Sequence, residues 1–458
     1  MDKAKDDAAE KIFSRVLKDI KPNDAEVRKT TQMVNKLILI LKKVVPKDVE
    51  LRVAGSIARG TNLRGNADID IFLLFSKGTS RERIAKEGLE YGKRAAKAAN
   101  GRYEIKYAEH PYVRLYLDSL GVRADLVPAS KISNIEEMAT TVDRTPLHTD
   151  FINKNLNSKQ RDHVRLLKHL LKAHSIYGAE VKTGGFSGYL CELLIHHYGS
   201  LPAFLENAAK YSIPIIIDPR FKKELKDPAI NKRFNSDFVV IDPVDKDRNV
   251  AAGVSKESLS KLVIIAREFA SNPGKDLFKN YVNELQHYGN YENFLRQSKL
   301  DSFIIEAKIS NKSDDVVFPQ LKKMSSIITE FAERSGFSIY VTMPHINAGK
   351  GYMLFLTPRM ELKTRLIKGP DAFISDAANN FIKSHKAGDG FVIRGSTIYA
   401  LDRNRHESVY DLLQKVIKGK VVKDGPDVKV KSSKIYVNKI PLAARKTLSA
   451  ELDKRLLL

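Results

Sequence analysis

The sequence predicts an α+β protein built from several domains. Its 458 residues correspond to about three average domains. Hydrophobic residues make up 43% and charged residues 29% of the chain, which is typical of a folded globular protein. Segments with apolar residues at helical spacing are mixed along the chain with short apolar segments typical of strands. Such a mixture predicts sheets covered by helices.

The composition argues against membrane-bound and secreted proteins. The longest unbroken apolar runs, such as Leu37–Leu41 and Ile71–Phe75, have five residues, whereas a membrane-spanning helix needs roughly 20. Residues 1–10 contain four acids and no apolar core, unlike a secretory signal. The single cysteine, Cys191, has no partner for an intramolecular disulfide. We therefore expect a cytoplasmic protein that does not bind membranes.

The first third of the chain alternates helices and strands. Val27, Val34, Leu37 and Leu41 recur at helical spacing, and Pro46 ends their helix. A turn at residues 55–56 opens a brief helical segment. The expected helices span 26–45 and 80–100, and the expected strands span 49–54, 67–75, 102–108, 112–118 and 122–127, the last ended by Pro128. These elements predict a first domain over residues 1–147.

The remaining residues predict two further domains. Residues 148–275 are mainly helical, with the clearest helices over 161–174 and 187–198. Residues 276–458 return to an α+β pattern. Its expected strands span 337–343, 352–356 and 391–400, and its expected helices span 325–335, 371–384 and 409–417.

An excess of positive charge indicates a polyanionic partner. The formal net charge is +23. Ten basic residues and only two acids lie between Leu412 and Ala450. Phosphate contacts by such residues release counterions and give affinity that does not depend on base sequence. The alternative is a solvated basic surface that serves solubility.

Three acids form the strongest chemical pattern in the sequence. Asp68 and Asp70 alternate with isoleucines in an expected strand, so both carboxylates lie on one face. Asp125 lies in a later expected strand. Neighbouring carboxylates repel each other unless a cation neutralises them. Mg²⁺ prefers carboxylate oxygens together with substrate phosphates, so the three acids predict a site for two metal ions.

A second motif, Gly55-Ser56, precedes the first acid of this group by about a dozen residues. A glycine before a short helix lets backbone amides approach a phosphate. Ser56 adds a hydroxyl, and Arg59 follows one turn later. Taken alone, a Gly-Ser is usually a turn and an Asp-x-Asp is usually an exposed strand edge. Together with Asp125 they indicate a nucleoside triphosphate and a metal.

The order of these motifs resembles the signature of the polymerase-β-like nucleotidyltransferase superfamily. Further segments are similar to archaeal-type CCA-adding enzymes, the tRNA nucleotidyltransferases that append the terminal CCA. These segments are 109–112 (EHPY), 144–148 (RTPLH), 177–180 (YGAE), 184–189 (GGFSGY), 242–243 (DP) and 248–252 (RNVAA). The similarity covers about residues 50–255.

The resemblance implies a nucleotidyltransferase head, a helical neck, and an α+β body with a tail. It implies that Asp68, Asp70 and Asp125 hold magnesium; the first acid of the pair is often Glu in relatives and is one methylene shorter here. It places Gly55, Ser56, Arg59, Thr145, His148, Lys168, Tyr177 and Arg248 on the incoming nucleotide, with Arg248 implicated in the choice of C and A. It further implies that the neck takes part in nucleotide selection and the C-terminal region in binding tRNA.

Each residue that the resemblance adds also has a purely structural interpretation. Lys168 lies on an amphipathic helix, where lysines are usually exposed. His148 could cap a helix starting near Thr149, Tyr177 could be a half-buried ring, and Arg248 could pair with a nearby acid, Asp245 or Asp247. Ser187 opens a helix and is best interpreted as its N-cap rather than as a nucleophile.

The function that we predict is template-independent addition of CCA to the 3′ end of tRNA from CTP and ATP, with two Mg²⁺ ions. The expected partners are the acceptor stem and 3′ end of tRNA, and a homodimer is compatible with the sequence. Two alternatives remain open: an RNA-tailing enzyme of the poly(A) or oligoadenylate type, and a non-catalytic RNA-binding protein on the same fold.

Overall fold

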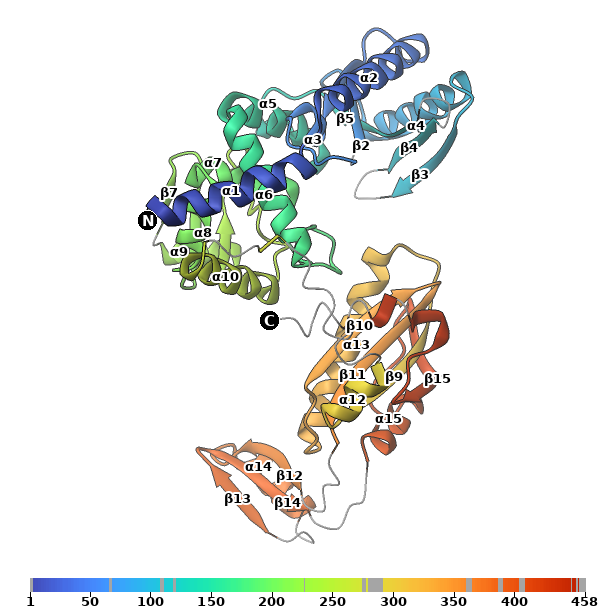
Figure 1. The fold of residues 1–458 in the computed structure, drawn as a ribbon. Coiled ribbons are helices and arrows are strands. Elements are labelled where there is room, and N and C mark those ends of the chain that lie inside the picture. Colours follow the sequence, from blue (N-terminus) through green and yellow to red (C-terminus); the bar gives the residue numbers. More distant parts are fainter. Residues whose placement is uncertain are drawn as a thin grey trace. The chain divides into compact units, whose positions relative to one another are not determined.

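In the computed structural model the chain divides into two units, which are described separately (Figure 1). The first combines residues 1–179 with 183–280, and the second combines residues 180–182 with 281–458. The structure describes residues 3–65, 68–107, 111–117, 121–225, 227–273, 277–278, 291–359, 365–385, 390–402, 408–445, 447–449 and 452. Both units mix helices and strands, in agreement with the predicted α+β class.

Five strands of the first unit form one sheet in the order β1-β2-β5-β4-β3. Strands β2 and β5 are parallel, and the other neighbouring strands are antiparallel. The elements of this region are α2 (Asp24–Val44), β1 (Glu50–Ala54), α3 (Gly55–Ala58), β2 (Asp68–Phe75), α4 (Arg81–Ala98), β3 (Arg102–Tyr107), β4 (Pro111–Leu117), β5 (Val122–Ser130) and two 3-10 turns, Ile135–Glu137 and Thr141–Arg144.

Helices α2 and α4 cover one face of this sheet (Figure 1). Leu37 and Leu41 of α2 are fully buried against strand residues such as Ile71 and Val113. Asn23 caps α2, because its side chain accepts from the Glu26 amide while Glu26 accepts from the Asn23 amide. The polar side chains of β2, β4 and β5 lie on the opposite face, which therefore carries the candidate active site described below.

Strand β5 runs through Pro128, where the sequence predicted its end. Residues up to Ser130 continue to pair with β2. Pairing between β4 and β5 has already ended at Val113 and Leu126, so Pro128 lies beyond the last β4 partner and its missing N–H interrupts no pairing on that side.

Helix α1 (Lys3–Ile20) has no counterpart among the predicted elements. Its buried residues Phe13, Val16 and Ile20 belong to the same core as helix α6 rather than to the five-stranded sheet. The Phe13 ring lies 6.3 Å from Phe269 and 5.9 Å from Phe278. The first helix of the chain is therefore held by residues that follow it by more than a hundred positions.

The helices after the sheet share this second core. They are α5 (Thr145–Asn155), α6 (Ser158–Ala173), α7 (Gly188–Tyr198), α8 (Leu201–Ala208), α9 (Pro228–Phe234) and α10 (Lys256–Ser271). The region also holds a three-stranded sheet that the sequence did not predict, in the order β7-β6-β8. Its strands are β6 (Ile215–Asp218), β7 (Lys223–Glu224) and β8 (Phe238–Val240).

The second unit is built on a four-stranded antiparallel sheet, β10-β11-β9-β15, with α13 and α15 packed on one face. A smaller sheet, β12-β14-β13, is covered by α14. The elements are α12 (Tyr291–Gln297), β9 (Leu300–Ile309), α13 (Asp314–Arg334), β10 (Val341–Asn347), β11 (Lys350–Pro358), β12 (Arg365–Asp371), α14 (Ser375–Ser384), β13 (Phe391–Arg394), β14 (Thr397–Asp402), α15 (Val409–Ile417), β15 (Val428–Val437) and a 3-10 turn, Leu442–Ala444.

The single strand predicted over 391–400 is wrong. The chain forms a hairpin there, because Gly395 adopts a positive φ of 61° and turns β13 back onto β14. Among the described residues, no helix has both the length and the apolar character needed to cross a membrane.

Candidate active site

Three acids lie on the face of the first sheet that α2 and α4 leave uncovered. Asp70 of β2 stands opposite Asp125 of β5 in the parallel register, and Asp68 stands opposite Arg123. The isoleucines that alternate with the two β2 acids, Ile69 and Ile71, are buried on the other face. The period of two in the sequence thus brings the carboxylates together.

Charge repulsion and burial act on Asp70. Burial is the larger effect and the neighbouring Asp125 carboxylate adds to it, which together raise the pKa of Asp70 to about 7. A nearby cation would stabilise the ionised form of such a carboxyl group. This is the behaviour expected of a ligand for a divalent metal.

Arginines neutralise the other two acids. Arg114 of β4 donates from Nε and Nη2 to the two oxygens of Asp125, each at 2.7 Å. Arg123 forms an ion pair with Asp68. Among the described residues, no group of three His, Cys, Asp or Glu side chains is arranged to hold a metal ion. The carboxylates therefore have the right chemistry and strand positions for a metal, but Asp68 and Asp125 must leave their arginines to use it.

Gly55 makes room for Asp70. It starts the short helix α3 with a positive φ of 71°, and a Cβ atom there would lie 1.9 Å from Asp70 Oδ2. Only glycine combines this backbone conformation with this close approach. Ser56 follows in α3 and is half-buried. The sequence motif therefore lies directly beside the carboxylates.

Replacing Gly55 by alanine is expected to reduce nucleotide incorporation at least about 100-fold, because the new Cβ displaces the Asp70 carboxylate and a misplacement of about 1 Å can cost that much. Gly65→Ala is the matched control, since Gly65 also has a positive φ, 76°, but no atom within 4 Å of the new Cβ. Backbone strain alone would affect both variants. Equal activities of the two variants in an incorporation assay would contradict this role of Gly55.

A buried ionic network lies behind the glycine turn. Glu192 of α7 is fully buried and forms ion pairs with Arg59 Nε at 3.1 Å and with Lys168 Nζ at 3.5 Å. Lys168 also donates to the backbone oxygen and the hydroxyl of Thr61, both at 3.1 Å, and Thr61 donates to Glu192. Lys168 is only 2% exposed, so the expectation of an ordinary exposed lysine is wrong.

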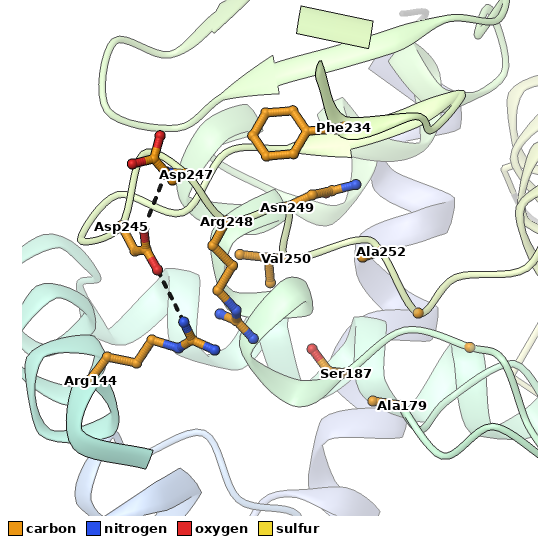
Figure 2. A pocket seen from close by; sticks show the side chains of 12 residues that line it. Arg144, Ala179, Ser187, Phe234, Asp245, Asp247, Arg248, Asn249, Val250 and Ala252 are labelled. Atoms are coloured by element: carbon orange, nitrogen blue, oxygen red, sulfur yellow. Dashed lines mark hydrogen bonds and ion pairs between the residues drawn. The ribbon is translucent and has the colours of Figure 1, made fainter. Parts of the chain in front are cut away.

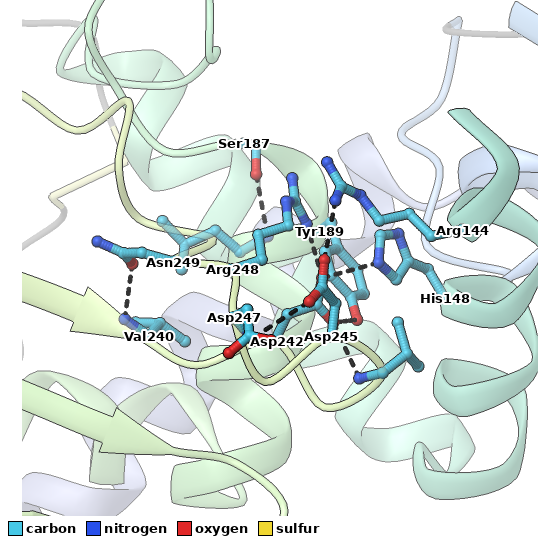
Figure 3. Close-up of polar contacts among 12 residues, drawn as sticks. Arg144, His148, Ser187, Tyr189, Val240, Asp242, Asp245, Asp247, Arg248 and Asn249 are labelled. Atoms are coloured by element: carbon cyan, nitrogen blue, oxygen red, sulfur yellow. Dashed lines mark hydrogen bonds and ion pairs between the residues drawn. The ribbon is translucent and has the colours of Figure 1, made fainter. Parts of the chain in front are cut away.

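A second network gathers on Asp242, as Figure 3 shows. Its carboxylate contacts His148 Nε2 at 2.9 Å, Tyr189 OH at 3.1 Å and Arg248 Nη1 at 2.8 Å. Burial opposes ionisation of Asp242, but the contacts with His148 and Arg248 outweigh it and lower its pKa to about 2. Burial lowers the pKa of His148, whose Nε2–H donates to the Asp242 carboxylate.

This arrangement decides between several structural interpretations. His148 lies inside α5 and is buried, so it does not cap a helix. Arg248 pairs with Asp242, whereas Asp245 pairs with Arg144 at 3.0 Å and Asp247 pairs with Arg233.

A pocket of about 530 Å³ opens beside Arg248 (Figure 2). Arg144 and Asp245 lie on one side of it, and Ser187 and Ala179 lie near its other side. Ser187 caps α7, since its hydroxyl accepts from the Leu190 amide, as its sequence position predicted. The pocket is therefore lined by charged side chains and by backbone, a combination suited to a polar ligand.

The remaining predicted residues lie around these networks. Thr145 is half-buried at the first position of α5. Tyr177 is half-buried, and the Lys172 ammonium lies 5.2 Å from the centre of its ring. A Cβ on Gly188 would lie 3.1 Å from Tyr177 OH and 3.5 Å from Lys168 Nζ, so these two groups lie close together.

Sequence reasoning assigned no individual role to the residues that connect these groups, although three of them lie in segments that carry the family resemblance. The connecting residues are Thr61, Arg114, Arg144, Tyr189, Glu192 and Asp242. Glu192 carries the clearest signal, because it interrupts the otherwise apolar start of α7. The Arg59 guanidinium lies 5.9 Å from the Tyr189 ring centre and so joins the two networks.

Three family models match successive parts of the chain. The nucleotidyltransferase domain model matches residues 34–155. A model described as tRNA nucleotidyltransferase, second domain, matches residues 162–279. A third, described as CCA-adding enzyme, C-terminal domain, matches residues 285–437. The last match extends the similarity well beyond residue 255, where the sequence motifs ended.

Curated relatives are similar over nearly the full length. The CCA-adding enzyme of Methanocaldococcus jannaschii is 37% identical over 419 residues, which cover 90% of this chain and 91% of the relative. The CCA-adding enzyme of Archaeoglobus fulgidus is 36% identical over 394 residues, or 84% of each chain. A solved structure of the Cid1 poly(U) polymerase has a TM-score of 0.49 at 18% identity, covering 61% of this chain and 99% of that one. The length and level of identity to the curated relatives show that the chain belongs to the archaeal-type CCA-adding enzymes, a family of tRNA nucleotidyltransferases with a polymerase-β-like fold.

Proposed function

We propose that the protein adds CCA to the 3′ end of tRNA from CTP and ATP without a nucleic-acid template, with the chemistry centred on Asp68, Asp70 and Asp125. The observation that carries this assignment is the register of β2 and β5, which sets Asp70 opposite Asp125. Pyrophosphate is the product that leaves. The membership of the chain in the CCA-adding family supports the choice of substrates.

Asp68 and Asp70 would hold two Mg²⁺ ions, and Asp125 would hold the one beside the 3′ hydroxyl. Bound Mg²⁺ supplies Lewis acidity that lowers the pKa of this hydroxyl and neutralises charge on the pyrophosphate. The close approach of the Gly55 backbone to the Asp70 carboxylate and the raised pKa of Asp70 support this use of the carboxylates. The three carboxylates would themselves contribute by fixing the attacking and leaving oxygens in line.

The nucleotide would lie between Gly55, Ser56 and Arg59 on one side and Thr145, His148, Tyr177 and Arg248 on the other. Gly55 and Ser56 offer backbone and hydroxyl groups to the triphosphate, and the pocket beside Arg248 has room for a base. Lys168 belongs to the same group, but its burial and its contacts with Thr61 and Glu192 favour a positioning role through Arg59.

Residues 148–275 would take part in nucleotide selection, and residues 276–458 would bind tRNA. The positive charge of the C-terminal region supports the second assignment, since ten basic residues lie between Leu412 and Ala450. Contacts to the tRNA backbone read shape rather than base sequence. Such an enzyme would act in the cytoplasm, and it could act as a homodimer.

An extension assay tests the proposal. Three tRNA transcripts, ending before CCA, after C and after CC, each receive one labelled nucleotide at a time with Mg²⁺. We expect C on the first two transcripts, A only on the third, and no addition beyond A. Chelation of Mg²⁺ with EDTA should stop incorporation.

Two other results would overturn the proposal. Long A tails would identify a tailing polymerase. Binding of tRNA with no incorporation of any nucleotide would identify a non-catalytic RNA-binding protein.

A further inference from the structure

We propose that the open face of strands β3 and β4 binds the single-stranded 3′ end of the RNA, next to the three carboxylates. This inference rests on the proposed function and adds the residues that hold the second reactant. We call this surface the β3–β4 face. It comprises Arg102, Glu104 and Lys106 of β3 and Tyr112, Arg114 and Tyr116 of β4.

The strand register defines this surface. Arg102 stands opposite Tyr116, Glu104 opposite Arg114, and Lys106 opposite Tyr112, so all six side chains lie on one side of the sheet. The residues that alternate with them in β4, Val113, Leu115 and Leu117, are fully buried on the other side, where α4 packs. None of the six is buried, although α4 covers the opposite side.

The chemistry of the β3–β4 face matches a single-stranded nucleic acid. Three of its six side chains are cations and one is an acid, and two are half-buried tyrosines. The Arg102 guanidinium lies 5.4 Å from the Tyr116 ring centre, and the Arg114 guanidinium lies 5.9 Å from that of Tyr112. Aromatic rings beside cations form platforms on which bases stack while the cations contact phosphates.

The order of strands places this surface on the correct side of the reacting phosphorus. Gly55 and Ser56 follow β1, at one edge of the order β1-β2-β5-β4-β3, and the carboxylates lie on β2 and β5 in the middle. If the nucleotide is bound on the β1 side of the carboxylates, the RNA whose 3′ hydroxyl attacks can be bound on the β4 side. In-line displacement requires the two reactants to approach from opposite sides.

Arg114 connects the surface to the reaction. It is 27% exposed and holds both oxygens of Asp125. If Asp125 held a metal ion, the Arg114 guanidinium would be without this partner and would be available to an anion next to the reacting phosphorus. A phosphate of the RNA 3′ end is the anion that the proposed reaction brings to this position.

The test compares two tRNA transcripts in EDTA, one ending after CC and one cut at the last base pair of the acceptor stem. The wild type should bind the first transcript more tightly. Tyr116→Ala should reduce this preference about 5- to 150-fold, the range of one lost base stack. Arg102→Gln should lower the salt dependence of log Kd by about 0.7 for the CC transcript only.

Two further variants serve as controls. Tyr103→Ala removes the neighbouring tyrosine, which is 44% exposed on the opposite face, and should keep the wild-type preference. Tyr116→Phe keeps the ring and loses only the hydrogen bond from Tyr116 OH to Glu104, so it should bind like the wild type. Loss of preference in both Tyr116 variants would indicate a general distortion of the sheet and would overturn the proposal.

Other outcomes would place a different occupant on the β3–β4 face. An equal loss of affinity for both transcripts would assign it to the duplex stem, and an increase in the KM for CTP alone would assign it to the nucleotide. Incorporation by the wild type is measured on the same preparations. No incorporation would count against the proposed function, whereas normal incorporation with an unchanged preference in Tyr116→Ala and Arg102→Gln would overturn this inference alone.

Discussion

Asp70→Asn is expected to abolish nucleotide incorporation and to make the metal-free protein more stable. Loss of a carboxylate that holds metal removes several kcal/mol of charge stabilisation in the transition state, which corresponds to a rate loss of at least about 10³-fold. The gain in stability has a separate cause. Asparagine keeps the shape of the side chain beside Gly55 and removes the charge that repels Asp125 and Asp68.

The pH dependence of unfolding separates these two effects. The pKa of Asp70 is about 7 in the folded protein against an ordinary aspartate value of 3.8, so between these values the folded state binds more protons than the unfolded state. Without metal, the contribution of this group to stability therefore falls as pH rises from about 4 to 7. The full effect is on the order of 4 kcal/mol at most.

Thermal unfolding in EDTA at pH 5 and pH 8 measures this difference. The wild type should lose more stability between the two pH values than Asp70→Asn. Added Mg²⁺ should raise the Tm of the wild type at pH 8 but not that of the variant. Asp68→Asn is the control for stability alone, because the Asp68 side chain is 56% exposed and its ion pair with Arg123 contributes little. Identical pH dependence of the wild type and Asp70→Asn would refute the explanation.

The second large effect concerns the buried pair of Lys168 and Glu192. Lys168→Met should lower the free energy of unfolding by about 3 kcal/mol, since it leaves a buried carboxylate with Arg59 as its remaining cation. Glu192→Gln should cost more, because it leaves two buried cations, Arg59 and Lys168, without a counter-charge. The double variant should be more stable than the sum of the two losses predicts.

Chemical denaturation of the three variants measures this cycle. Lys159→Met is the matched control, because Lys159 is an exposed lysine on the same helix and its loss should change stability by less than about 0.5 kcal/mol. If Lys168→Met kept the stability of the wild type and raised the KM for CTP, Lys168 would be a direct ligand of the nucleotide. That result would contradict the positioning role assigned to it.

The sequence predicted that Asp68 and Asp70 lie on one face of a strand, because strand periodicity is a local signal. Once the residues around them form a strand, Asp68 and Asp70 share a face of it, and this does not depend on how the rest of the chain folds. The Gly55 turn was local too, although its close approach to Asp70 was not visible in the sequence. The family resemblance then added Thr145, His148, Lys168, Tyr177 and Arg248.

The buried network could not be predicted in the same way. The pattern around Lys168 is that of an amphipathic helix, and its buried counter-ion, Glu192, lies 24 residues later on another helix. The partner of Arg248 is Asp242 rather than the nearer acids Asp245 and Asp247, because burial of Asp242 selects the pair. Such pairings depend on how helices pack, which a single sequence does not specify.

The position of helix α1 has a consequence for synthesis of the protein. Phe13 and Val16 leave the ribosome well before their partners Phe269 and Phe278, which are translated more than 250 residues later. At about 5 to 20 residues per second, the apolar stripe of α1 waits on the order of ten seconds or longer for the surface that covers it. During that interval the nascent chain exposes an apolar helix face of the kind that chaperones bind, and the exposure ends only after α10 and Phe278 have been translated.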